Sequence, residues 1–241
     1  MMRLIFVILL ALFTSHSALA KPIVADLSSH VIEIHSGFSG TELLLFGARN
    51  DPGDILVVVR GPERDFIVRR KQQVLGLWVN REQERFESLP YFYAVSSSRP
   101  VDMIKGLNNF SSLEINPNDI IHETGSFGPR DHFASALLRQ LWSSGLYQQE
   151  PNTVEFFGET LFKTTIEFPD DMPRGIYTAE VYLISDGQLV GVQSTPIHVY
   201  KTGFDAFVYD SAHNNSVFYG LAAIIIATSF GMGASQLFRR S

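Results

Sequence analysis

Short apolar runs that alternate with polar positions dominate the first half of the chain. They are rich in β-branched and aromatic residues, and turn-forming segments separate them, such as residues 50–53 (Asn-Asp-Pro-Gly) and 61–62 (Gly-Pro). Short strands spaced about 8–12 residues apart with turn residues between them are typical of a β-sandwich or barrel. The predicted strands of this group are residues 31–34, 42–46, 54–60, 66–70, 74–79 and 91–95.

A second group of alternating runs lies closer to the C-terminus. It predicts strands at residues 161–168, 175–184 and 189–200, with Asp186-Gly187 as the hairpin turn between the last two. A turn that carries Pro173 and Gly175 leads directly into the predicted strand at residues 175–184, and Tyr177 lies near the start of this strand. In immunoglobulin-like sandwiches a tyrosine at such a corner bonds back to the preceding loop. We therefore expect a mainly β fold, an immunoglobulin-like β-sandwich in which Tyr177 is structural.

Between the two strand groups the apolar period changes to that of a helix. The apolar positions of residues 129–144 form one continuous stripe on a helix surface: Phe133, Ala134, Leu137, Leu138, Leu141 and Trp142. Asp131 is a candidate N-cap and Gly145 a candidate C-terminal stop. We expect the stripe to pack on the sandwich, as part of a helical insertion at about residues 100–146. If the stripe were exposed, it would instead be a docking face for a partner.

The C-terminal segment has the pattern of a membrane-spanning helix. Residues 216–238 carry no charged side chain, and Arg239 and Arg240 follow immediately. A helix needs about 20 apolar residues to cross a bilayer. We therefore expect a transmembrane helix at 216–238 and a short cytoplasmic tail at 239–241.

The N-terminal segment has the three parts of a secretory signal peptide. A basic start at Arg3 precedes an apolar run of about ten residues, and Ala18-Leu19-Ala20 supplies the cleavage pattern. Residues 1–20 are thus predicted to be removed, and residues 21–211 to form a periplasmic domain. Arg239 and Arg240 after the final helix favour a cytoplasmic location for the C-terminal tail, because cytoplasmic segments next to membrane helices are rich in Lys and Arg. The expected localisation is the bacterial inner membrane, as a single-pass protein.

Composition narrows the class of partner for this domain. The part of the chain between the leader and the final helix carries 16 basic and 25 acidic side chains, and the sequence has no cysteine. An acidic domain is unsuited to binding nucleic acid. The absence of cysteine excludes disulfides, thiolate metal sites and cysteine catalysis.

The sequence carries little that indicates catalysis. Ser96, Ser97 and Ser98 lie outside any Gly-x-Ser-x-Gly context, and the glycines form no phosphate-binding fingerprint. Glu33 and His35 share one face of a predicted strand and could be two ligands of a metal. Two ligands are a weak pattern, so the sequence assigns no catalytic residue, no cofactor and no metal site. We expect the protein not to be an enzyme.

Two surfaces are candidates for interaction. Arg69, Arg70, Lys71 and Arg81 form a basic group in an otherwise acidic domain, which indicates either an anionic partner or a solvated hairpin edge. In the final helix a small residue recurs every fourth position, a spacing that lets two membrane helices approach closely. These helix-packing residues are Ala223, Ala227, Gly231 and Ser235. The partner of such a helix would be a second copy or a polytopic membrane protein, and plain anchoring is the alternative.

The chain resembles the alphaproteobacterial putative transmembrane protein family. The resemblance rests on residues 68–80 (Val-Arg-Arg-Lys-x-x-Val-x-Gly-x-Trp-Val-Asn) and 92–100 (Phe-Tyr-Ala-Val-Ser-Ser-Ser-Arg-Pro), together with the leader and the single final helix. The segments at 145–147, 161–162 and 173–177 fit the same family. The resemblance implies topology and no catalytic residue. It also implies neighbours similar to sulfite-exporter-type permeases, and hence an accessory role.

Two functions of different class remain open from the sequence. The first is a non-enzymatic periplasmic binding domain that is accessory to a membrane partner. The second is a membrane-tethered periplasmic enzyme or metal-binding protein, with a site near Glu33 and His35 or in the helical insertion. Because the sandwich carries no catalytic motif, the first is favoured.

Overall fold

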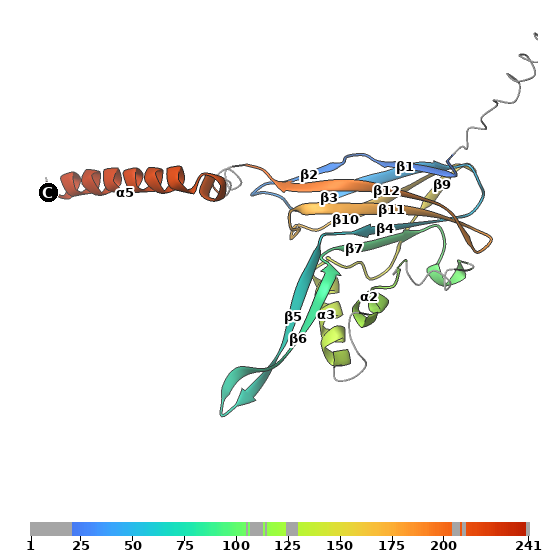
Figure 1. Ribbon diagram of the computed structural model, residues 1–241, viewed down its shortest axis with the longest axis horizontal. Helices are drawn as coiled ribbons and strands as arrows, with labels where there is room; N and C mark the ends of the chain where they lie inside the picture. Colours follow the sequence, from blue (N-terminus) through green and yellow to red (C-terminus); the bar gives the residue numbers. More distant parts are fainter. Residues whose placement is uncertain are drawn as a thin grey trace, which may run out of the picture.

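The strands form two sheets that face each other, and Figure 1 shows them as the main body of the protein. The computed structural model describes residues 21–104, 106, 113, 115–123, 130–203, 208 and 211–239. Sheet 1 has four strands, in the order β1 (Ile23–Leu27), β3 (Thr41–Arg49), β10 (Leu161–Phe168) and β9 (Glu155–Phe157). Sheet 2 has six, in the order β2 (Val31–Ile34), β12 (Gln188–Lys201), β11 (Gly175–Ser185), β4 (Asp54–Arg60), β7 (Tyr93–Ser97) and β8 (Asn152–Thr153).

The main core lies between the two sheets. Strands of sheet 1 alternate strictly, so every second side chain of β1 and β10 is buried. These inward side chains meet those of sheet 2 in one apolar cluster, which includes Leu45, Phe162, Ile166, Val57, Tyr177, Val181 and Ile197. The mainly β architecture predicted from alternation is confirmed.

Several strand predictions needed correction. The predicted strand at residues 74–79 is wrong, because Leu75 and Gly76 form a two-residue turn with positive φ angles of 51° and 82°. This turn joins β5 (Glu63–Val74) to β6 (Leu77–Pro90) in a long hairpin that projects from the sandwich (Figure 1). β1, β8 and β9 were not predicted. The turn at Asp186-Gly187 is confirmed, with φ angles of 48° and 80°.

Helices cover the outer face of sheet 2. They are the short η1 (Val101–Met103), α2 (Pro117–Glu123) and α3 (Arg130–Ser143), which lie between β7 and β8 in the chain (Figure 1). The α3 stripe packs with outward side chains of β4, β7 and β11 in a second apolar cluster, which includes Leu137, Leu138, Leu141, Leu56, Val58, Val95 and Tyr182. The expected packing of the stripe on the sandwich is therefore confirmed. α3 ends at Ser143, and Gly145, two residues later, has the positive φ of 70° that is common after a helix C-terminus.

Three hydrogen bonds around Arg60 and Glu180 join β4 and β11 of sheet 2 and connect them to the inserted segment. The Arg60 guanidinium of β4 donates hydrogen bonds to the Glu180 carboxylate of β11 and to the carbonyl of Leu113. The Tyr182 hydroxyl also donates to Glu180, at 2.8 Å. Burial on its own would lower the pKa of Arg60, but the hydrogen bond with Tyr182 and the nearby charges raise it. Arg60 therefore joins sheet 2 to the inserted segment as a fixed cation.

The predicted tyrosine corner is also present. The Tyr177 hydroxyl donates a hydrogen bond of 3.0 Å to the carbonyl of Pro173, four residues earlier. The ring is fully buried between the sheets, and burial raises the pKa of its hydroxyl well above the ordinary value.

Candidate interaction surfaces

An apolar row crosses the outer face of sheet 1 from edge to edge. The register pairs Val24 with Ala48, Ala48 with Leu161, and Leu161 with Phe157, so these four side chains lie side by side on four strands. Val24, Phe157 and Leu161 are each more than half exposed. Exposed apolar groups that form a continuous patch mark interaction sites more often than scattered ones do. We call these four residues the apolar row.

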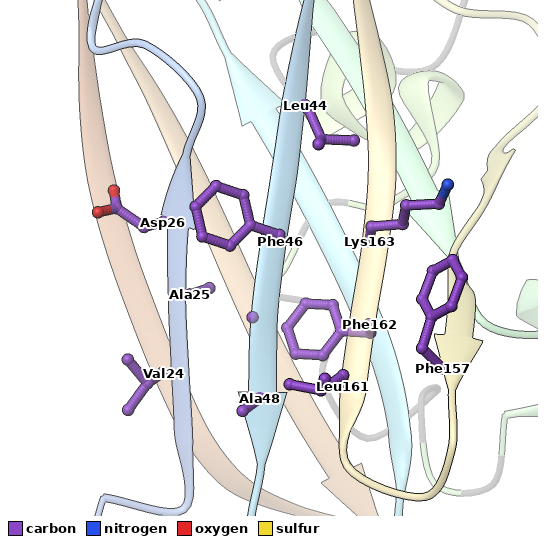
Figure 2. Close-up of a pocket in the computed structure, with 11 residues that line it drawn as sticks. Val24, Ala25, Asp26, Leu44, Phe46, Ala48, Phe157, Leu161, Phe162 and Lys163 are labelled. Carbon is purple, nitrogen blue, oxygen red and sulfur yellow. The ribbon is translucent and has the colours of Figure 1, made fainter.

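The next register row adds an aromatic side chain flanked by charges. Phe46 of β3 pairs with Asp26 on one side and with Lys163 on the other. The Lys163 ammonium lies 4.8 Å from the centre of the Phe157 ring, and 3.4 Å from the Glu155 carboxylate. Figure 2 shows Phe46, Leu161 and Phe157 around this part of the face. The surface thus combines an apolar strip with a polar rim, as the centre and edge of protein interfaces do.

A depression of about 430 Å³ lies on this face and is bordered by the small residues Ala25, Gly47 and Ala48. Of these three, only Ala48 is at an outward position, between Val24 and Leu161 in the row. Glycine is required at Gly47, because a Cβ at this position would lie 2.5 Å from the Phe162 ring, which is in the core (Figure 2). A protruding apolar side chain of a partner could fill such a depression.

This surface has little signal in the sequence. Each of its strands carries at least one apolar residue at an outward position beside those that face inward, as in Ile23-Val24 and Leu44-Leu45. Such consecutive apolar residues are the sequence signal that points to an exposed apolar face. The pairing of β10 with β3, which joins the β1–β3 pair to the β9–β10 hairpin and so assembles the row, depends on contacts distant in sequence.

The predicted basic group lies on the projecting hairpin. Arg69, Arg70, Lys71 and Arg81 are all exposed. Arg70 pairs with Glu82 and Lys71 pairs with Asn80, so a register shift leaves Arg81 between these two partners. The structure therefore brings Arg70, Lys71 and Arg81 together. Arg70 pairs with Glu82 at 3.5 Å, a solvent-exposed contact that contributes little stability.

The C-terminal helix, α5 (Ser216–Arg239), extends away from the sheets (Figure 1). Residues Ser216–Ser235 have a mean hydropathy of 1.8 and none of this span is buried. The small residues Ala223, Ala227, Gly231 and Ser235 are exposed, and a Cβ at Gly231 would meet nothing within 4 Å. The side chain of Arg239, the whole of Arg240 and the predicted leader lie outside the described residues.

The residues weighed as metal ligands are placed apart from any larger cluster. Glu33 and His35 are both exposed, but β2 ends at Ile34, so His35 lies just beyond the strand that was predicted to carry both. His35 Nδ1 accepts a hydrogen bond of 3.1 Å from the Gly37 N–H. His30 instead contacts Asp26, at 2.8 Å. Within the ranges that the structure describes, no group of three or more His, Asp or Glu could hold a metal.

A polar cleft of about 890 Å³ lies beside β7 and α2. Ser97, Ser98, Arg99 and Asp119 contribute to its lining. The Ser97 hydroxyl donates to the Arg99 carbonyl at 2.6 Å, and the Ser98 hydroxyl contacts Asp54 at 3.3 Å and accepts from the Ile55 N–H. These hydroxyls are thus engaged in holding the end of β7.

Comparison with known proteins agrees with the apolar character of α5. No curated protein matches the sequence. A family model described as "Putative transmembrane protein" (Alph_Pro_TM) matches residues 22–240, which is nearly the whole chain. Together with the single long apolar helix, this match makes the chain a membrane protein that belongs to the Alph_Pro_TM family of putative transmembrane proteins.

Proposed function

We propose that this protein is a non-enzymatic, single-pass protein of the bacterial inner membrane whose periplasmic domain is accessory to a membrane partner. The domain binds a periplasmic part of a polytopic protein, such as a permease similar to the sulfite exporters. α5 supplies the anchor, and the predicted leader and Arg239-Arg240 give the orientation.

The observation that carries this proposal is the bare apolar row on sheet 1. It has a concave centre and charged neighbours, and the described part of the chain places nothing over it. Burying such a row against a partner gains about 25 cal/mol for each Å² of apolar surface removed from water. A binding role uses this geometry without further chemistry.

The helix offers a second contact with the same partner. The small side chains of Ala223, Ala227 and Gly231 let another helix approach closely. The hydroxyl of Ser229 donates to the Ile225 carbonyl at 2.7 Å, so it needs no partner in the membrane.

The strand orders support the immunoglobulin-like part of the proposal. Sheet 1 runs β1-β3-β10-β9, which corresponds to strands A-B-E-D of that sandwich, and β12-β11-β4 correspond to G-F-C. The Tyr177 corner precedes β11 at the position of strand F. Many sandwiches of this kind act as binding domains, although the fold on its own assigns no function.

A gentle-detergent pull-down of the full-length protein, with mass spectrometry of what co-purifies, tests the proposal. Leu161→Glu places a charge in the apolar row, and Thr165→Glu is the matched control, since Thr165 lies on the same strand and face. We expect a polytopic membrane protein with the parent chain and with the control, and its loss with Leu161→Glu. Gly231→Ile is expected to weaken the same complex through the helix.

Other outcomes would replace the proposal. Recovery of the chain alone, as an oligomer that Gly231→Ile disrupts, would indicate a homodimer. The alternative of a tethered enzyme or metal-binding protein draws on the polar cleft near Arg99 and Asp119. A bound metal in elemental analysis, lost when Asp119 is replaced by Ala, would favour that alternative over a binding role.

A further inference from the structure

The hairpin of β5 and β6 has two halves with different surroundings. In the half near the sandwich, Phe66 and Val68 pack against the second apolar cluster, and Phe86 and Leu89 are buried in it. In the outer half, residues 69–83, every side chain is exposed. The outer half therefore extends beyond anything that the fold needs for its core.

The end of this hairpin is an apolar tip. Its residues are Val74, Leu75, Leu77, Trp78 and Val79, and Leu75 is fully exposed while Leu77 and Trp78 are about 70% exposed (71% and 69%). Leu75 also has a φ of 51°, a conformation that costs about 1 kcal/mol for a residue with a side chain. Asn or Gly would form this turn without the cost. An apolar side chain kept in a strained, exposed turn points to a role outside the fold.

The tip is apolar on both faces of the ribbon. The register pairs Val74 with Leu77 and Gln72 with Val79, which places Val74, Leu77 and Val79 on one face, while Trp78 is on the other with Gln73. A strand pair that docks on a protein surface needs only one apolar face, with its other face polar. A tip that is apolar all round suits an apolar medium that can surround it.

A basic collar surrounds the tip. Between residues 69 and 83 there are four basic side chains and one acidic side chain, Glu82, although the exported part of the chain as a whole is acidic. Arg69, Arg70, Lys71 and Arg81 lie directly behind the apolar tip. Apolar and Trp side chains beyond a basic collar match the layers of a bilayer surface, where headgroups carry negative charge above the acyl chains.

The hairpin and the membrane anchor leave the same end of the sandwich. Thr178 pairs with Arg60, and Gly175 pairs with Val199, so the start of the hairpin lies near the point where β12 ends. β5 has 12 residues, a length of about 35–40 Å. The 14 residues between Lys201 and Ser216 can span at most about 50 Å. The tip can therefore reach the membrane surface into which α5 inserts.

A bulge sets the direction of the hairpin near the sandwich. Ser88 has a φ of 52°, and its N–H donates a hydrogen bond of 3.1 Å to Asp65. Arg85 donates to the same carboxylate, and this bond together with the Ser88 N–H lowers the pKa of Asp65 below its ordinary value. Bulges of this kind bend a strand pair. The hairpin is thus held at an angle to the sheets (Figure 1).

We propose that the apolar tip of the β5–β6 hairpin inserts into the lipid surface of the membrane that anchors the chain, with the basic collar on anionic headgroups. Insertion is shallow, because the outer edges of a two-stranded ribbon carry unpaired backbone groups that lipid cannot satisfy. The tip and α5 then fix the domain at two points on one membrane. This inference needs no protein partner and does not rest on the proposed accessory function.

Site-specific labelling of the full-length protein tests this placement. The chain has no cysteine, so Leu75→Cys gives a single thiol for the fluorophore NBD. The labelled protein is reconstituted alone into vesicles of phosphatidylcholine and phosphatidylglycerol, with or without brominated acyl chains. We expect bromolipid to quench the label about two-fold or more, since interfacial segments lie at the boundary of the acyl chains.

The matched control is Gln188→Cys, at the exposed first position of β12, directly after the β11–β12 turn at the other end of the sandwich. Its label is expected to stay unquenched by bromolipid and accessible to iodide. Equal bromolipid quenching at both positions, or none at Leu75→Cys, would overturn the proposal. Protection of Leu75→Cys from iodide without quenching by bromolipid would mean that a second copy of the chain covers the tip, which also overturns it.

The collar is tested by charge. Replacing Arg69, Arg70 and Lys71 by Gln is expected to lower the insertion equilibrium about five-fold for each side chain changed. Raised salt and vesicles without phosphatidylglycerol should weaken quenching in the same direction. If none of these three treatments changed the quenching at Leu75→Cys, the basic collar would have no role in insertion.

Discussion

The two outer faces of the sandwich differ in how their apolar side chains are covered. On sheet 2, outward residues such as Leu56, Val58 and Tyr182 are buried under α2 and α3. On sheet 1, outward residues such as Val24 and Leu161 are exposed. Both faces carry apolar side chains in register, but among the residues that the structure describes, helices cover only the face of sheet 2.

This difference means that apolar side chains on sheet 2 contribute to the stability of the fold, whereas those on sheet 1 are free to contribute to binding. Apolar contacts on sheet 2 are made in the isolated chain and stabilise its fold. The described part of the chain makes no such contact over the apolar row on sheet 1, so the side chains of the row are available to a partner. The same chemical type of residue therefore predicts opposite effects of mutation on the two faces.

The largest expected effect is at the covered face. Leu141→Ala removes a buried side chain from α3 and is expected to lower the free energy of unfolding by about 3 kcal/mol, because it leaves a cavity. Leu161→Ala, at the bare face, should change it by less than about 0.5 kcal/mol. Urea unfolding of the full-length protein in detergent, followed by Trp142 fluorescence, measures both. Similar losses in the two variants would contradict the comparison.

The attachment of the helices to sheet 2 is the next target. Arg60→Met keeps the length of the side chain but leaves the Glu180 carboxylate without its cation, at an expected cost of about 2 kcal/mol. Hydrogen exchange should then rise first in α3, since Arg60 joins the sheet to the inserted segment. A uniform rise over β3 and β10 as well would show that this contact does not act locally.

At the bare face, a change should affect binding and leave folding intact. Phe46→Ser removes an exposed aromatic side chain beside the apolar row and is expected to weaken a partner complex about ten-fold, equivalent to about 1.4 kcal/mol. The fraction of partner recovered in the pull-down measures this effect, with Tm as the control for folding. A lower Tm with unchanged recovery would reverse the assignment of this face.

The smallest effect concerns the core that both sheets share. Tyr177→Phe loses the hydrogen bond to Pro173 and is expected to cost about 1 kcal/mol at neutral pH. Burial raises the pKa of Tyr177 in the folded state, so the folded state keeps the proton that the unfolded chain releases above about pH 10. Stability should therefore fall as the pH rises through that range, and less steeply in Tyr177→Phe. Alkaline unfolding curves with equal slopes would contradict this.

Much of the fold could be predicted because its signals are local. The alternation in β10 and β11, the helical period of α3 and the turn before Tyr177 each occupy a few consecutive residues. The positions of these elements were correct to within a few residues. β1 was missed although Ile23-Val24-Ala25 has strand-forming residues, because a short run beside Pro22 carries little weight on its own.

The hairpin and the apolar row could not be predicted, for two physical reasons. The middle of β6 is the polar run at residues 80–85, which forms a strand because β5 pairs with it, not because of its own propensity. Residues 74–79 contain several strand-forming side chains, which concealed a turn signalled only by Gly76. The row needs the pairing of β1, β3, β10 and β9, which local periodicity does not reveal.

The place of β12 in its sheet has a consequence for the order of assembly. β12 is the last of the described strands, yet it lies between β2 and β11 in sheet 2. It pairs in parallel with β2, which is close to the start of the domain in the sequence. A chain is synthesised from its N-terminus, and pairings between distant segments form late. Sheet 2 is therefore complete only when Val199 has emerged, shortly before the first residues of α5. The domain therefore finishes folding only while its anchor is being made, although the hairpin and sheet 1 are built from segments that precede β12.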